Sequence, residues 1–161
     1  MGRRTAEVAE LYAGPPSEFV RRRDALAGRL REQGRAEEAA EVRRLRKPTA
    51  VVWAINRLAH ETPAKIRAFL DATGRVRRAQ AGGHGDLDEA SAAQRRALRT
   101  LVSEAASGLG GAPGPVPAAI IRRIETTLLA AAADTRLHEA LREGRLTEEL
   151  ESPGFDALAG V

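Results

Sequence analysis

The sequence predicts an all-α protein of about seven helices, arranged as a helical bundle with one long antiparallel helical hairpin. Three observations lead to this prediction. Apolar residues recur at the three- and four-residue spacing of helices. Glycine and proline separate the apolar segments, and no segment alternates in the manner of a half-buried strand. Hydrophobic residues make up 43% of the chain but aromatic ones only 3%, so we expect a core of Leu, Val, Ile and Ala.

Three helices are predicted before Pro48: residues 5–13, 17–33 and 36–46. Gly14-Pro15-Pro16 ends the first helix and starts the second with a proline. In the second helix, Glu18 has the spacing to pair with Arg22. Gly34 supplies the C-terminal stop of this helix, and Lys47-Pro48 closes the third.

The fourth predicted helix, which Pro48 opens, is the most apolar in the chain. One stripe of this helix holds Val51, Ile55, Leu58 and Ala59. The only tryptophan, Trp53, projects away from that stripe and shares its face with Thr49, Asn56, Arg57 and His60. The helix is therefore either buried on both sides or carries an aromatic and polar recognition surface.

The rest of the chain predicts two long helices in a hairpin and two further helices. Thr62-Pro63 reads as a cap and first-turn proline for residues 64–80. The glycine-rich residues 82–85 form the hinge, and Asp86 to Glu89 has the form of a capping box for a helix that ends near residue 109. A Gly- and Pro-rich stretch precedes the last elements: a helix over 118–133, a helix from Asp134 to Glu143, and a tail that includes Phe155.

Charge divides the chain into two unequal halves. Residues 1–85 carry 18 Lys and Arg against 10 Asp and Glu, a net +8, and residues 86–161 carry 8 against 12, a net −4. We predict a basic N-terminal helical region, 1–81, which includes the Trp53 helix, and an acidic C-terminal region, 86–161. The two would form one compact domain with a hinge at 82–85. The basic half suggests a polyanionic partner, or the acidic half neutralises it within the fold or in a head-to-tail assembly.

Several functional classes have no support in the sequence. The absence of cysteine excludes disulfides and thiol chemistry and fits a reducing cytoplasm. The N-terminus lacks the apolar run of a signal peptide, and no apolar stretch is long enough to cross a membrane. His60, His84 and His138 have no zinc-site spacing, and Gly108 to Gly111 follows a helix rather than the strand of a phosphate loop. We therefore expect a cytoplasmic, non-enzymatic protein without metal or cofactor.

The best candidate for a nucleic-acid or partner surface is a set of cations and polar residues before and on the Trp53 helix: Arg43, Arg44, Arg46, Lys47, Thr49, Trp53, Asn56 and Arg57. Residues 36–58 have the dimensions of a helix-turn-helix unit, whose second helix would enter the major groove. A structural interpretation also fits: the cations complement a helix dipole, and Trp53 packs under a neighbouring helix with its N–H bonded.

Two hypotheses for function follow from these features. The leading one is nucleic-acid association through the basic N-terminal half. The alternative is a module for protein-protein interaction or oligomerisation, in which the hairpin over residues 66–109 pairs with the helices of a protein partner or of a second copy.

Several short motifs resemble a family of uncharacterised all-helical proteins of GC-rich bacteria. They are Leu45-Arg46-Lys47-Pro48-Thr49, Trp53-Ala54-Ile55-Asn56-Arg57-Leu58, the segment from Phe19 to Ala25, Arg122-Arg123-Ile124-Glu125, Gly144-Arg145-Leu146 and Pro153-Gly154-Phe155. The resemblance covers most of the chain. It implies a helical fold in the cytoplasm of a bacterium, and it brings no activity, catalytic residue or cofactor.

Overall fold

The computed structural model describes residues 2–83, 85–110 and 114–151, and within these ranges all regular structure is helical. The eight α-helices are α1 (Gly2–Ala13), α2 (Phe19–Glu32), α3 (Ala36–Arg44), α4 (Ala50–Glu61), α5 (Pro63–Gln80), α6 (Leu87–Gly108), α7 (Ala118–Ala133) and α8 (His138–Arg142). The all-α prediction is confirmed, although the described residues form eight helices rather than about seven. A 3-10 turn at Thr135–Leu137 lies between α7 and α8, where the sequence predicted two separate helices. His84 of the predicted hinge and the tail with Phe155 lie outside the described residues.

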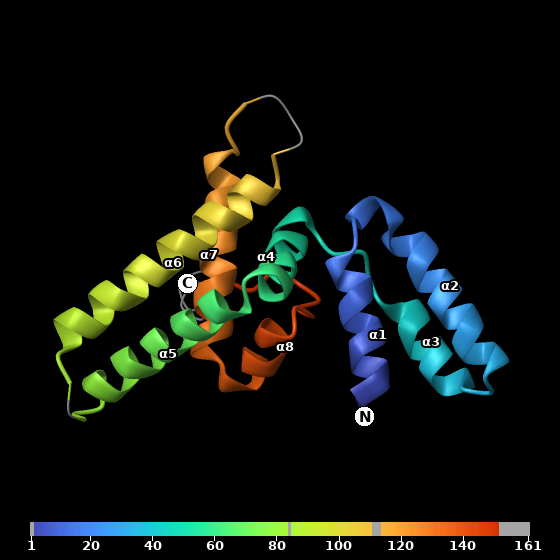
Figure 1. Ribbon diagram of the computed structural model, residues 1–161, viewed down its shortest axis with the longest axis horizontal. Helices are drawn as coiled ribbons and strands as arrows, with labels where there is room; N and C mark the ends of the chain where they lie inside the picture. Colours follow the sequence, from blue (N-terminus) through green and yellow to red (C-terminus); the bar gives the residue numbers. More distant parts are fainter. Residues whose placement is uncertain (1, 84, 111–113, 152–161) are drawn as a thin grey trace, which may run out of the picture.

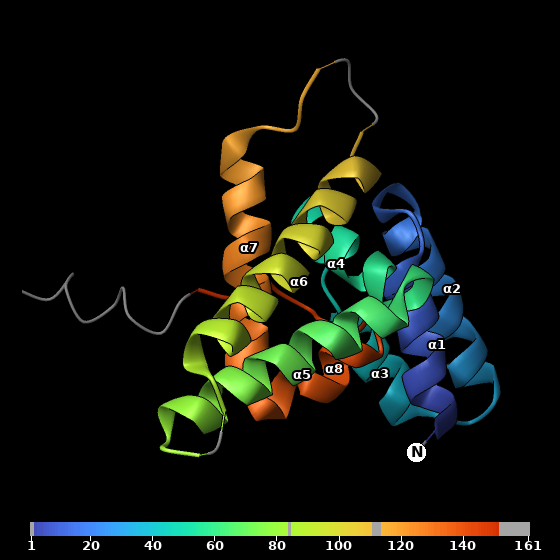
Figure 2. The same cartoon turned by 60° about the vertical axis from the view of Figure 1, so that its left-hand side comes forward.

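The helices pack in two groups, with α4 between them (Figure 1). Helices α1 to α3 lie together and enclose two small apolar clusters, one around Leu30 and Val42 and one formed by Leu11, Tyr12 and Phe19. Helices α4 to α8 share a single large core, and Figure 2 shows α5 and α6 crossing over this group. The extended connection of residues 45–49 links the two packing groups, and α1 also packs against α4.

Helix α4 is the centre of the fold. Seven of its 12 residues are buried, and it packs against α1, α5, α6, α7 and α8. The sequence left two alternatives for this helix, and the structure falls between them: the apolar stripe and Asn56 are buried, Trp53 and Arg57 are half-buried, and Thr49 and His60 are exposed.

Arginine side chains occupy the ends of two helices at glycines. A Cβ on Gly14, just after α1, would lie 1.6 Å from Nη1 of Arg22, and a Cβ on Gly108, at the end of α6, would lie 1.8 Å from Nη2 of Arg57. Each guanidinium thus fills space that only glycine leaves open, beside the negative end of a helix dipole. The spacing predicted that Arg22 pairs with Glu18, and this prediction is wrong because the Arg22 guanidinium lies at Gly14.

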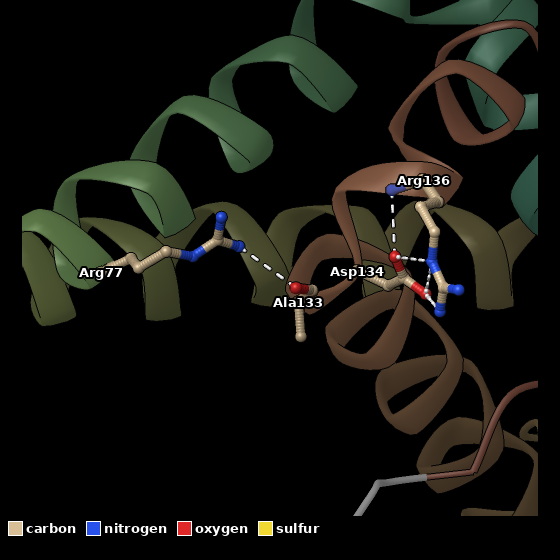
Figure 3. Close-up of polar contacts among 4 residues, drawn as sticks. All are labelled: Arg77, Ala133, Asp134 and Arg136. Atoms are coloured by element: carbon tan, nitrogen blue, oxygen red, sulfur yellow. Dashed lines mark hydrogen bonds and ion pairs between the residues drawn. The ribbon is translucent and has the colours of Figure 1, made fainter.

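A third arginine acts at the end of α7. Nη2 of Arg77 donates to the carbonyl oxygen of Ala133 at 3.2 Å (Figure 3) and to that of Ala132 at 3.3 Å. His138 also contacts the Ala132 oxygen, at 2.9 Å. These contacts satisfy carbonyls that have no partner within the helix, and they tie α5 to the end of α7.

Polar contacts also fix the helix starts and the pairing of α5 with α6. The Asp86 carboxylate accepts from the N–H groups of Asp88 and Glu89 at 2.8 and 3.2 Å, as the capping box predicted. The Thr62 hydroxyl instead donates back to Leu58 at 3.1 Å and does not cap α5. Helices α5 and α6 pack against each other, and an ion pair joins Lys65 at the start of α5 to Glu104 near the end of α6.

Candidate functional site

The eight candidate residues fall into two groups. The first, which we call the basic segment, consists of Arg43, Arg44, Arg46 and Lys47, at the end of α3 and in the connection to α4. All four side chains are exposed, and none of them has an ion pair with any residue in the described ranges. The second group, on and just before α4, is engaged in contacts within the fold.

The backbone that carries the basic segment is anchored. Leu45 ends α3 in an extended conformation and packs against both small apolar clusters, while Pro48 is buried. Between these anchors, Nη1 of Arg23 donates to the Leu45 carbonyl at 3.0 Å, and the Tyr12 hydroxyl donates to the Arg46 carbonyl at 3.4 Å. The connection therefore has a defined course, and its cations point to solvent.

The two donors are themselves held by their surroundings. Nε and Nη2 of Arg23 contact the Asp24 carboxylate at 3.0 and 2.9 Å. Tyr12 is inaccessible to solvent and packs against Phe19, with 5.2 Å between ring centroids. Burial raises the pKa of Tyr12, so its hydroxyl remains a donor at physiological pH.

Asn56 belongs to the interior of the fold. Its side chain is completely buried, its Nδ2 donates to the Leu146 carbonyl at 2.9 Å, and its Oδ1 accepts from the Leu146 N–H at 2.9 Å. This amide pairs with a backbone 90 residues away as one strand pairs with another. Asn56 is thus not available to a partner, and its role is to hold the segment after α8 against α4.

Gly144 brings the chain close enough for that pairing. Its φ of +64° favours glycine. A Cβ at this position would lie 2.6 Å from the Asn56 carbonyl oxygen and 2.6 Å from Nε2 of His60. Of the face predicted to be polar and outward, the Asn56 part is therefore covered by residues 144–146.

Trp53 and Arg57 cover each other at the edge of the large core. Trp53 is half-buried and packs against that core. The Arg57 guanidinium lies 5.3 Å from the centre of its ring and pairs with Glu61 at 3.6 Å. Nε1 of Trp53 is buried and has no hydrogen-bond partner among the described residues, in contrast to the bonded N–H that the structural interpretation predicted.

Thr49 joins the basic and acidic halves of the chain. Its Oγ1 accepts from the Val52 N–H at 3.3 Å and caps α4. Glu149 accepts two hydrogen bonds from Arg123. Burial raises the pKa of Glu149, but Arg123 and the nearby Thr49 hydroxyl outweigh it and hold the pKa below its usual range. One acidic residue of the C-terminal half is therefore satisfied internally.

These positions exclude α4 as a recognition helix of the helix-turn-helix type in this structure. A recognition helix lays an exposed polar face in the major groove, whereas α4 packs against five other helices, its Asn56 is inaccessible, and its Trp53 and Arg57 are half-buried. Of the candidate surface, the basic segment alone combines full exposure with free charge within the described chain.

A second feature, which the sequence did not predict, is a cavity of about 790 Å³ between α6 and α7. Its walls are mainly apolar and its edge carries two charges: the lining includes Leu98, Val102, Val116, Ile121, Arg99 and Glu125. Helical periodicity assigns such residues to a buried stripe, so it gives no signal for a hollow between two stripes.

No other protein gives information on function. Neither a protein-family model, a curated protein nor a solved structure matches the chain, so the resemblance to a bacterial family stays a prediction. Within the described residues, no three His, Asp or Glu side chains group as a metal site would require. No helix in the same ranges has the length and apolar character to cross a membrane.

Proposed function

We propose that the protein associates with nucleic acid through the phosphate backbone, without reading the base sequence, and that the basic segment is the contact surface. One observation carries the proposal: four exposed cations lie within five residues, free of ion pairs in the described structure, on a backbone anchored at both ends. Guanidinium and ammonium groups bind phosphate oxygens and release counterions, which supplies most of sequence-independent affinity.

The state of α4 supports a phosphate-directed mode over base reading. Reading bases takes a polar side chain that reaches into a groove, and binding single strands takes an exposed aromatic ring for stacking. Asn56 is buried, and the ring of Trp53 is half-buried under Arg57. Neither residue offers these contacts, so we expect similar affinity for duplexes of different sequence.

The test is fluorescence anisotropy of a labelled duplex of about 20 base pairs, titrated with the protein at two salt concentrations. Four phosphate contacts would weaken binding on the order of 100-fold between about 50 and about 200 mM salt. Two duplexes of unrelated sequence should give the same affinity. A preference of more than about 10-fold for one sequence, worth about 1.4 kcal/mol, would contradict the phosphate-directed mode.

Two matched variants distinguish binding through the basic segment from binding that depends only on the net charge of the protein. Changing Arg43, Arg46 and Lys47 to Glu should abolish binding at the higher salt concentration. The control changes Arg29, Arg67 and Arg75 to Glu, because these arginines are also exposed and unpaired in the described chain but lie on α2 and α5. Equal losses in both variants would show that net charge, and not the basic segment, causes the binding.

The alternative is a module for protein-protein interaction or oligomerisation, and the α6–α7 cavity is the observation that favours it. The hairpin expected from the sequence, α5 with α6, would then supply one wall of the docking site. Leu98 and Leu101 belong to the large core, so polar changes there would unfold the bundle. Light-scattering mass of the wild type and of a Val102→Ser variant, whose side chain lines the cavity, tests self-association instead.

A further inference from the structure

We infer that Tyr12 and Arg23 are positioning residues for nucleic-acid binding: they hold residues 45–47 in the extended course that presents the basic segment to phosphate groups. This inference rests on the proposed function and concerns residues outside the candidate surface that the sequence predicted. Tyr12 lies on α1 and Arg23 on α2, so the helices before the basic segment would act as its frame.

The two contacts fall on successive residues of the connection. Arg23 donates to the Leu45 carbonyl at 3.0 Å and Tyr12 to the Arg46 carbonyl at 3.4 Å. Leu45 is the last anchor before Arg46 and Lys47, and Pro48 is the next. The exposed stretch between these two anchors is therefore only two residues long, and side-chain donors hold it where it has no helical hydrogen bonds.

Neither residue can itself be a principal phosphate contact. The guanidinium of Arg23 is committed on three nitrogens, with Asp24 neutralising its charge, and 21% of its side chain is exposed. Tyr12 is 0% exposed. Any effect that these residues have on binding must therefore act through the backbone of residues 45 and 46.

Such anchoring changes affinity through entropy. A free connection loses conformational freedom when its side chains are fixed on a phosphate backbone, whereas an anchored one has lost that freedom during folding. Preorganisation of this kind raises affinity without adding a contact. The number of phosphates neutralised, and hence the salt dependence, should stay the same when the anchors are removed.

The test uses the full chain with Tyr12→Phe and Arg23→Lys, separately and combined, in the same anisotropy assay with duplex DNA. Both substitutions keep the net charge, and lysine lacks the planar fork that serves Leu45 and Asp24 together. The combined variant should bind about 5-fold more weakly, with an unchanged slope of affinity against salt. Changing Arg46 and Lys47 to Gln should instead lower that slope by about two phosphate contacts.

Amide hydrogen exchange of Leu45, whose N–H donates to the Val42 carbonyl at 3.1 Å, provides the second readout. Exchange there should accelerate in the combined variant while α4 stays as protected as in the wild type. Arg29→Lys is the matched control, since Arg29 is an exposed arginine of the same helix without an ion pair in the described chain. It should change neither affinity nor exchange.

The outcomes separate this inference from the proposed function. If the wild type does not bind duplex DNA even at low salt, both fail. If the wild type binds and the combined variant binds equally well, the proposed function stands and the positioning role is wrong. A loss of affinity accompanied by loss of α4 protection would show that the variant unfolds more widely, which also overturns a role confined to the basic segment.

Discussion

The helices before the basic segment and those after it differ in how their apolar cores are built and in which polar side chains make contacts within the fold. Helices α1 to α3 rest on two small apolar clusters and end in exposed, unpaired cations. Helices α4 to α8 share one large core, and there Asn56, Arg77 and Glu149 are consumed by contacts within the fold. The net charge of a segment is therefore a poor measure of its binding surface, because the contacts of each charged group within the fold decide whether that charge is available at the surface.

The first prediction concerns the buried amide of the C-terminal bundle. Asn56→Ala removes both hydrogen bonds to Leu146 and leaves its buried N–H and carbonyl without partners. We expect a loss of about 3 kcal/mol in the free energy of unfolding, measured by chemical denaturation. The control is the charge reversal of Arg43, Arg46 and Lys47, which should change stability by less than about 0.5 kcal/mol per site. A large loss in that control would mean that the basic segment also stabilises the fold.

The second prediction tests the close approach at Gly144. Gly144→Ala introduces a Cβ 2.6 Å from the Asn56 carbonyl oxygen at a φ of +64°. Contact with a rigid backbone cannot be relieved by rotation of a side chain, so we expect a cost of about 2 kcal/mol. Gly28→Ala is the control, because a Cβ on this exposed glycine of α2 meets nothing within 4 Å and should stabilise the helix by up to about 1 kcal/mol. Equal effects at the two glycines would refute the steric argument.

The third prediction concerns Thr49, where the two regions meet. Thr49→Val keeps the shape of the side chain but removes the hydroxyl that caps α4 and that helps to lower the pKa of Glu149. A loss of about 1 kcal/mol is expected, and Thr49→Ser should recover most of it in the same thermal unfolding assay. If serine were no better than valine, the methyl group of Thr49 and not its hydroxyl would be the stabilising part.

Features local to one helix were predictable from the sequence, as Asp86 and Gly14 illustrate. A capping carboxylate and a glycine or proline stop act within a few residues, so their pattern is visible along the chain. Thr62 was predicted to cap the helix after it and does not, because its hydroxyl lies between two helices and donates to a carbonyl of the helix before it. The predicted partner of Glu18 was wrong for a similar reason. Glu18 pairs with Arg21 at 3.1 Å, and the Arg22 side chain lies at the end of α1.

The candidate site was predicted in part. The basic segment was visible because four cations lie within five residues, but their freedom from ion pairs depends on which carboxylates the fold brings near. Asn56 was misassigned because a helical wheel shows the apolar stripe of α4 but not a segment 90 residues away that covers the other face. Tyr12 and Arg23 were not predicted as part of the site, because they lie 34 and 22 residues along the chain from the carbonyls to which they donate. For the contact between Asn56 and Leu146, the only local hints are an Asn amid apolar residues and the isolated Gly144-Arg145-Leu146 later in the chain.

The smallest expected effect is that of an exposed ion pair on the C-terminal bundle, where charge is displayed as it is in the basic segment. Hydrogen bonds from the side chain and then the backbone N–H of Arg136 lower the pKa of Asp134 from its ordinary 3.8 to about 2 (Figure 3). Because the pKa is lower in the folded state, the charged carboxylate stabilises the fold above about pH 4, and this contribution disappears as the pH falls from about 4 to about 2.

Asp134→Asn should therefore flatten the dependence of melting temperature on pH in that window alone, by a small amount because solvent screens the pair. Arg136→Gln should flatten the same window less, since it removes the guanidinium but keeps the backbone N–H that also lowers the pKa of Asp134. A pH dependence that survives both changes would come from other carboxylates, and Glu149, held between Arg123 and Thr49, would be the next to replace. That result would extend the comparison between the two regions. The acid sensitivity of the bundle would then arise from Glu149, which makes contacts within the fold, and not from the exposed pair of Asp134 and Arg136.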